Sequence, residues 1–209
     1  MELDGLKEGI VTDVPYLLVD FAKLPRRCKR VLDLGSGNGI ITLLMAERYP
    51  DVQFVDLEVS SRLCDMARKN AVKAGISNRF EVINADVKQA KEHIKAESFD
   101  VVVMNLPFWQ AGKISPNEIR RIARHTDKET FLTFLDTSAF ALKNRGTMYG
   151  AFSTEHIDST IIEMEKKRLI VKEMKFVHGT LKANSKRVLI KALKNASGGV
   201  KVLPPVLNP

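Results

Sequence analysis

The sequence has few of the features that mark several protein classes. Only two of its 209 residues are cysteines, which excludes a disulfide framework and any cysteine-based zinc site. The four histidines lie far apart without metal-ligand spacing, so no metal site is expected. No apolar run approaches the ~18 residues of a membrane span, and residues 1–10, MELDGLKEGI, lack the apolar core of a signal peptide. We therefore expect a cytoplasmic protein without membrane contact, and a monomer by default.

Positive charge is concentrated in one part of the chain. The net charge is +8, and residues 166–201 contain eleven Lys and Arg but only one acid, Glu173. Such a local excess suggests a phosphate-rich partner such as RNA. The alternative is a solvated, lysine-rich surface without a partner.

Apolar residues alternate between strand and helix patterns. Strands are predicted at 31–35, 52–58, 80–84, 99–105, 146–152, 169–177 and 187–193, and helices at 40–48, 60–74, 87–95, 128–142 and 154–167. This alternation predicts an α/β fold with a mainly parallel, seven-stranded Rossmann-like sheet and helices on both faces. The last two strands are joined by HGTLKANSK, which has no room for a helix and predicts an antiparallel hairpin.

The domain organisation is expected to be simple. With 44% hydrophobic residues and no visible boundary, residues 1–209 are expected to form a single domain with a full core. Residues 195–209 are Gly- and Pro-rich, and they are expected to form either a surface strap or a disordered tail.

The segment DLGSGNG, residues 33–39, joins a predicted strand to a predicted helix. Its glycines allow a ligand to approach the backbone closely, but their G-x-G-x-G spacing differs from the G-x-G-x-x-G of dinucleotide enzymes. Asp33 would repel a pyrophosphate, whereas it suits a ligand with a sulfonium and an ammonium group, as in S-adenosylmethionine (SAM). The cofactor-binding residues expected here are Asp33, Gly35, Ser36, Gly37, Asn38 and Gly39.

Polar residues also follow the next predicted strands. Glu58, next to Val59, is expected to accept both ribose hydroxyls of a nucleoside, with Asp56 as the alternative on the same strand. Asp86 is expected to accept from an adenine amino group beside the backbone N–H of Val87, or to cap the following helix. With Asn105, these groups lie at the carboxyl ends of neighbouring strands, where open α/β sheets bind ligands.

In this order and spacing, DLGSGNG, Glu58, NAD (84–86) and NLPF (105–108) resemble a class I SAM-dependent methyltransferase. NLPF resembles the (N/D/S)PP(Y/F/W) motif of enzymes that methylate planar nitrogens, with Leu106 in place of the first Pro. The segments FWQAG and ARHT, the final hairpin and the closing PPVLNP resemble bacterial valine-tRNA adenine-N6 methyltransferases. This resemblance covers most of residues 9–209 and implies that residues 1–30 include a segment covering SAM.

The resemblance implies SAM as cofactor, S-adenosylhomocysteine as product, and tRNA or another RNA as substrate. The Asn105 side-chain oxygen and the Leu106 carbonyl would accept the two N–H groups of an adenine amine, while Pro107 keeps Leu106 extended. Phe108 and Trp109 would stack on the base.

Further residues are expected to contact RNA rather than the reacting amine. Arg124 and His125 would contact phosphates or order the loop after Trp109. The remaining candidates for backbone contacts lie in the final hairpin, and these are Lys182, Lys186 and Arg187.

Three other functions compete with RNA methylation. The target of a SAM-dependent enzyme can be a protein glutamine or a small amine, in which case the basic charge is incidental. A non-catalytic RNA-binding module is suggested only by Leu106. An NAD-dependent dehydrogenase would need a hydride-transfer site and a third phosphate-loop glycine, which the sequence lacks.

Overall fold

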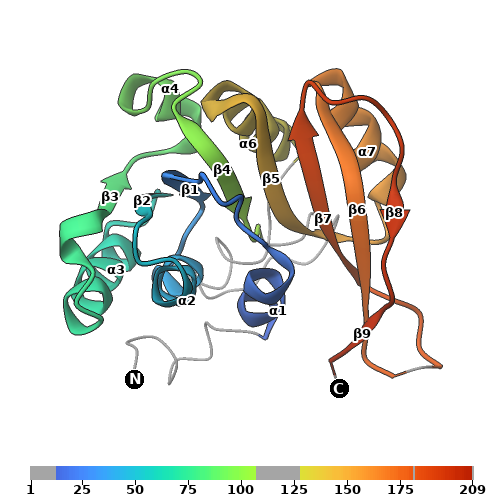
Figure 1. Ribbon diagram of the computed structural model, residues 1–209, viewed down its shortest axis with the longest axis horizontal. Helices are drawn as coiled ribbons and strands as arrows, with labels where there is room; N and C mark the ends of the chain where they lie inside the picture. The colour runs from blue at the N-terminus through green and yellow to red at the C-terminus, as the bar shows by residue number, and fades with distance from the viewer. Residues whose placement is uncertain (1–12, 107–127, 181, 209) are drawn as a thin grey trace.

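The computed structural model describes residues 13–106, 128–180 and 182–208 (Figure 1). The strands are β1 (Arg30–Leu34), β2 (Gln53–Glu58), β3 (Phe80–Asn84), β4 (Phe99–Met104), β5 (Leu142–Ser153), β6 (Leu169–His178), β7 (Arg187–Lys194), β8 (Lys201–Val202) and β9 (Val206–Leu207). The helices are α1 (Val14–Phe21), α2 (Ile40–Arg48), α3 (Ser61–Lys73), α4 (Ala90–His93), α6 (Lys128–Ala141) and α7 (Ile157–Lys166), with 3₁₀ turns at Ser77–Arg79 and Val87–Gln89.

The strands form one mixed sheet in the order β3-β2-β1-β4-β5-β7-β6-β8. Strands β1 to β5 run parallel to one another, whereas β7 lies antiparallel between β5 and β6. The short β6–β7 connection therefore makes the predicted hairpin, and β7 enters the sheet between two strands that precede it in sequence. The predicted fold class is confirmed.

The C-terminal residues cover the outer edge of the sheet. Strands β8 and β9 both run parallel to β6, with Glu173 paired to Lys201 and Val177 paired to Val206. The Nζ of Lys172 also donates to the carbonyls of Ser197 and Gly198 at 3.1 and 3.0 Å. The tail is thus a surface strap, and within the described residues the sheet has nine strands rather than seven. Covering the edge removes unpaired backbone groups that would otherwise pair with another chain.

Two hydrophobic cores lie on opposite faces of the sheet. Val31, Phe54 and Tyr149 pack on the face covered by α1 and α2, whereas the other face packs against α6 and α7 (Figure 1). The Tyr149 hydroxyl donates to the carbonyl of Lys23 at 2.6 Å, which ties the segment after α1 to the centre of the sheet. Helix α1 lies within the expected covering segment, and its contact with SAM stays a prediction.

Helix α1 was not predicted from the sequence, and two predicted elements have clearly different bounds. Strand β5 begins at Leu142, directly after α6, because Leu142 pairs with Phe99 before a register shift in the β4–β5 ladder. The predicted helix 87–95 is a 3₁₀ turn followed by α4, and it ends where Ile94 becomes extended and buried. Among the described residues, no helix is both long and apolar enough to cross a membrane.

Candidate cofactor crevice and methyl-transfer site

The glycine turn between β1 and α2 depends on left-handed backbone conformations. Gly35, Gly37 and Gly39 have φ angles of 72°, 61° and 80°, which L side chains rarely adopt. A Cβ atom at Gly35 would lie 3.2 Å from the Leu106 side chain, and one at Gly39 would lie 3.2 Å from the Cβ of Ala67. A Cβ at Gly37 would meet no atom of the described residues within 4 Å. Among these residues, Gly37 thus presents bare backbone beside open space, as close approach of a ligand requires.

Glu58 connects this turn to the start of α3. Its side chain is buried, with Oε2 accepting from the Gly37 N–H at 3.0 Å and Oε1 accepting from the Ser60 N–H at 2.9 Å. The rival acid, Asp56, has an exposed fraction of 0% and accepts from the Thr42 hydroxyl at 2.6 Å. Both acids are therefore near the turn, and the assignment of the ribose contact to Glu58 stays a prediction.

Asp33 is the most unusual polar group of the site. Its exposed fraction is 1%, and neither carboxylate oxygen has a hydrogen-bond partner among the residues that the structure describes. Burial, reinforced by the charges of Asp56 and Glu58, raises the pKa of Asp33 well above its usual range. Burial also raises the pKa of Asp56 to about 7, against the opposing effect of the Thr42 and Ser36 hydroxyls. These buried acids offer a site to a cationic ligand.

Asn84, at the end of β3, holds the segment after β2, a role that sequence analysis missed. Its Nδ2 donates to the carbonyls of Glu58 and Val59 at 3.0 and 2.9 Å. Val59 itself is 52% exposed, so that a flat ligand can contact it. The only sequence signal was the position of Asn84 in the NAD segment, directly before Ala85 and Asp86.

A second missed residue supports the glycine turn from α3. The Nδ2 of Asn70 donates to the carbonyl of Asn38 at 3.1 Å, and Asn70 has an exposed fraction of 0%. Asn38 and the buried Ser36 both lie within the turn, as predicted, although their contact with a cofactor is untested.

Asp86 and Val87 follow β3 at the same edge of the sheet. The exposed Asp86 accepts from the Lys88 N–H at 2.9 Å and so caps the 3₁₀ turn at Val87–Gln89. Val87 is buried in the core. The capping alternative is therefore observed, and the proposed adenine contact remains a prediction.

Asn105 and Leu106 leave the sheet beside the glycine turn. Strand β4 pairs with β1 up to Met104 and Leu34, so Asn105 and Gly35 are the next residues on adjacent strands. Leu106 is 9% exposed and belongs to the core near Phe134, so its side chain points inward. The other predicted substrate residues Pro107, Phe108, Trp109, Arg124 and His125 lie outside the described residues.

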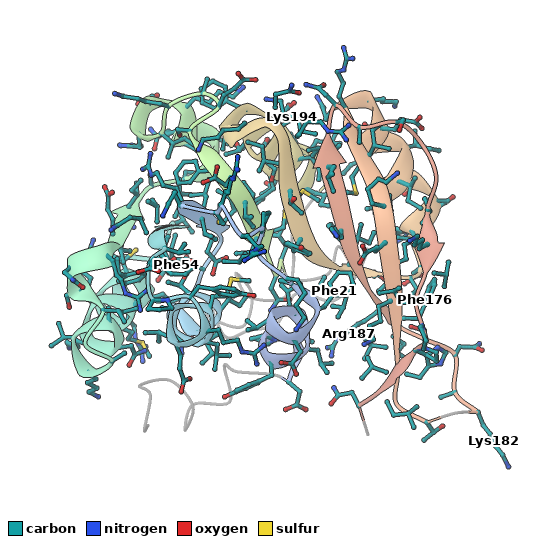
Figure 2. The ribbon with its side chains drawn as sticks, viewed as in Figure 1. Phe21, Phe54, Phe176, Lys182, Arg187 and Lys194 are labelled. Atoms are coloured by element: carbon teal, nitrogen blue, oxygen red, sulfur yellow. The ribbon has the colours of Figure 1, made fainter. Side chains whose placement is uncertain are left out.

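The basic C-terminal region is only partly available to a partner. Many of its cations make internal contacts: Lys166 with Glu163, Lys167 with Asp136, Lys191 with Glu173, Lys194 with Glu97, and Lys172 with the tail. Burial lowers the pKa of Arg187, and the negative charge of Asp13 opposes that shift. Lys182 and Lys186 are exposed, and Figure 2 shows Lys182 pointing away from the protein at the end of the hairpin.

Sequence comparison identifies relatives for most of this chain. The family model described as "Methyltransferase small domain" matches residues 15–149. A protein of Bacteroides thetaiotaomicron named tRNA1(Val) (adenine(37)-N6)-methyltransferase is 29% identical over 82% of this chain and 72% of its own length. A protein of the same name from Haemophilus influenzae strain PittEE is 31% identical over 68% of this chain. The chain spans only 56% of the length of that relative.

Solved structures share the fold at lower sequence identity. A predicted O-methyltransferase from Agrobacterium tumefaciens has a TM-score of 0.74 at 21% identity and covers 92% of this chain and 86% of its own. A precorrin-6y C5,15-methyltransferase from Geobacter metallireducens has a TM-score of 0.62 at 13% identity, with 92% of each chain covered. At these identities the likeness concerns the fold alone. With the glycine turn and acidic strand ends in place, the chain belongs to the methyltransferase small domain family.

Proposed function

We propose that the protein methylates the exocyclic N6 amine of an adenine in tRNA, with SAM as the methyl donor. The observation that carries this proposal is the position of Asn105 and Leu106 directly beside the glycine turn. The relatives named as tRNA adenine-N6 methyltransferases support the choice of substrate.

The residues around the turn fit the charge and shape of the proposed cofactor. The buried, unpartnered carboxylate of Asp33 is suited to a positively charged group, since it has no other partner among the described residues. Glu58 would accept ribose hydroxyls, and the exposed Val59 would offer an apolar contact to the adenine. Asp86 and the backbone N–H of Val87 would hydrogen-bond its edge. When bound, SAM supplies a methyl group on a positively charged sulfur.

The chain itself supplies orientation of the amine. An exocyclic amine is a poor nucleophile because its lone pair is delocalised into the ring. By accepting its two N–H groups, the Asn105 side-chain oxygen and the Leu106 carbonyl would aim the lone pair and favour the developing positive charge. The Leu106 side chain is anchored in the core. Its packing would therefore keep the Leu106 backbone rigid, as the ring of the first proline does in the (N/D/S)PP(Y/F/W) motif.

RNA as the partner is supported by the exposed cations of the final hairpin. Lys182 and Lys186 have exposed side chains and would contact phosphates. Phe108 and Trp109 would stack on a base that is already accessible in an RNA loop. A tRNA substrate would place the reaction in the cytoplasm.

The decisive experiment uses SAM with a labelled methyl group and unmodified tRNA transcripts. After incubation, the RNA is digested and the labelled nucleoside is identified. We expect N6-methyladenosine. Label in other nucleosides would contradict the N6 assignment, and label only in a protein glutamine or a small amine would contradict RNA methylation.

A further inference from the structure

Three carboxylates lie together on one face of the sheet, and we call them the acidic cluster. They belong to Asp33 on β1 and to Asp56 and Glu58 on β2, with exposed fractions of 1%, 0% and 6%. Asp33 and Asp56 are register partners, so their side chains project from neighbouring positions on the same side of the sheet. All three face the layer that contains α2 and the glycine turn.

The three carboxylates differ in how many hydrogen bonds they accept. Glu58 accepts two backbone N–H groups, and Asp56 accepts one hydroxyl, from Thr42. Neither oxygen of Asp33 has a partner among the described residues, and the second oxygen of Asp56 also lacks one. A buried carboxylate without a partner is strongly disfavoured in its charged form. It therefore tends to keep its proton and stay neutral.

The groups around the cluster supply no compensating positive charge within the described part of the chain. On α3, Cys64 faces Glu58. Burial raises the pKa of the Cys64 thiol to about 11, so the thiol stays neutral. Arg68 is half exposed and pairs with Asp65 at 3.0 Å. On α2 and in the turn, the facing groups are the neutral hydroxyls of Thr42 and Ser36.

We propose that Asp33 and Asp56 share a proton in the cofactor-free protein and release it to solvent when SAM binds, so that this pair favours SAM over its product. The proposal rests on the proposed function, because it takes SAM as the ligand of the crevice. Only a carboxyl O–H bond breaks, and the proton goes to water or buffer. SAM carries one more positive charge than S-adenosylhomocysteine, because methyl transfer leaves a neutral sulfur. SAM therefore stabilises the ionised pair more than the product does.

The two aspartates have different parts in this pair. Asp33 is the group without a hydrogen-bond partner among the described residues, and it would face the bound cation. Asp56 is a positioning residue beneath the turn, since its Oδ2 lies 3.4 Å from where a Cβ of Gly39 would be. It acts through its charge on Asp33 and need not touch the cofactor.

The test counts protons by titration calorimetry. Binding of SAM and of S-adenosylhomocysteine is measured between pH 5.5 and 8.5, at each pH in two buffers that buffer at that pH and have different ionisation enthalpies. We expect SAM to release more protons than the product, and the Kd of SAM to fall by up to roughly tenfold per pH unit as long as the free pair holds its proton. The ratio of product Kd to SAM Kd should rise over the same range.

Asp56→Asn separates this linkage from ordinary binding, because the side chain keeps its shape and an oxygen for Thr42. We expect the difference in proton release between the two ligands to disappear and their affinity ratio to become independent of pH. The matched control is Asp100→Asn at the amino end of β4, where the carboxylate pairs with Lys143 at 2.6 Å. This control should keep the full linkage.

Equal proton release by SAM and product in the native protein would overturn the inference while leaving the proposed function intact. Persistence of the difference in folded Asp56→Asn would do the same. Absence of binding of either ligand would contradict the proposed function as well. If Asp56→Asn does not fold, the proton counts of the native protein still decide, because they need no variant.

Discussion

The Oε2 of Glu58 accepts a hydrogen bond from the Gly37 N–H at 3.0 Å, so the acid that ends β2 holds the glycine turn that follows β1. Its Oε1 accepts from Ser60 at the start of α3. One carboxylate thereby fixes the positions of two neighbouring βα connections. The same carboxylate is the group we propose for the ribose hydroxyls of SAM, so shape and affinity of the crevice are coupled.

Glu58→Gln should lower both the stability of the protein and its affinity for SAM. An amide offers one acceptor oxygen to the two N–H groups of Gly37 and Ser60, and its NH₂ would oppose the other donor. We expect a loss of about 1–3 kcal/mol in unfolding free energy and at least tenfold weaker SAM binding. Urea unfolding and calorimetry would measure these effects, and unchanged values in both would contradict this role.

Gly37→Ala should impair cofactor binding more than folding. The φ of 61° costs an alanine about 1–2 kcal/mol, yet the added methyl meets no atom of the described residues within 4 Å and would enter the space beside the turn. The control is Gly179→Ala, where φ is not positive and the added methyl also meets no described atom within 4 Å. SAM affinity falling in both variants alike would argue against a ligand at Gly37.

Asn105→Ala should abolish methyl transfer while leaving SAM binding within a few-fold of native. Removing one positioned hydrogen-bonding group at a reacting centre typically costs about 10²–10³ in kcat. Asn144→Ala is the control, because Asn144 bonds Asn195 well away from the crevice edge of β4 and β1. Single-turnover rates with saturating SAM give the answer, and native rates in Asn105→Ala would refute the assignment.

The unfolding free energy of the cofactor-free protein should depend on pH through Asp56. The folded-state pKa of Asp56, about 7, lies above the unfolded value of about 3.9, so the folded state binds the proton more tightly. The stability that comes from this tighter proton binding is lost as pH rises between the two pKa values. Between pH 5 and pH 8 the native protein should lose roughly 3 kcal/mol relative to Asp56→Asn. Urea unfolding of both proteins at each pH would test this, and a constant difference would contradict it.

Replacing Lys182 and Lys186 together by alanine should weaken tRNA binding and make it less dependent on salt. Two lost phosphate contacts would lower the slope of log K against log salt by about 1–2. Lys166→Ala is the control, because Lys166 pairs with Glu163 at 2.8 Å. If the double variant kept the native salt slope, the hairpin would not be the RNA surface.

Much of the fold could be predicted because its signals are local. Apolar periodicity located the seven long strands, and the short connection before Arg187 revealed the hairpin. The tail strands escaped prediction because β8 and β9 are two residues long and exist only by pairing with the edge of β6. The early start of β5 likewise depends on its pairing with Phe99.

The candidate site shows the same division. Sequence alone determined the glycine turn and the polar residues that end the parallel strands, because both depend on short motifs beside strand patterns. Only the tertiary structure decided that Asp33 and Asp56 are neighbours, that Asn84 and Asn70 hold the surrounding segments, and that Leu106 points into the core. Those relationships arise from strand register and helix packing, which bring together residues that are distant in the chain.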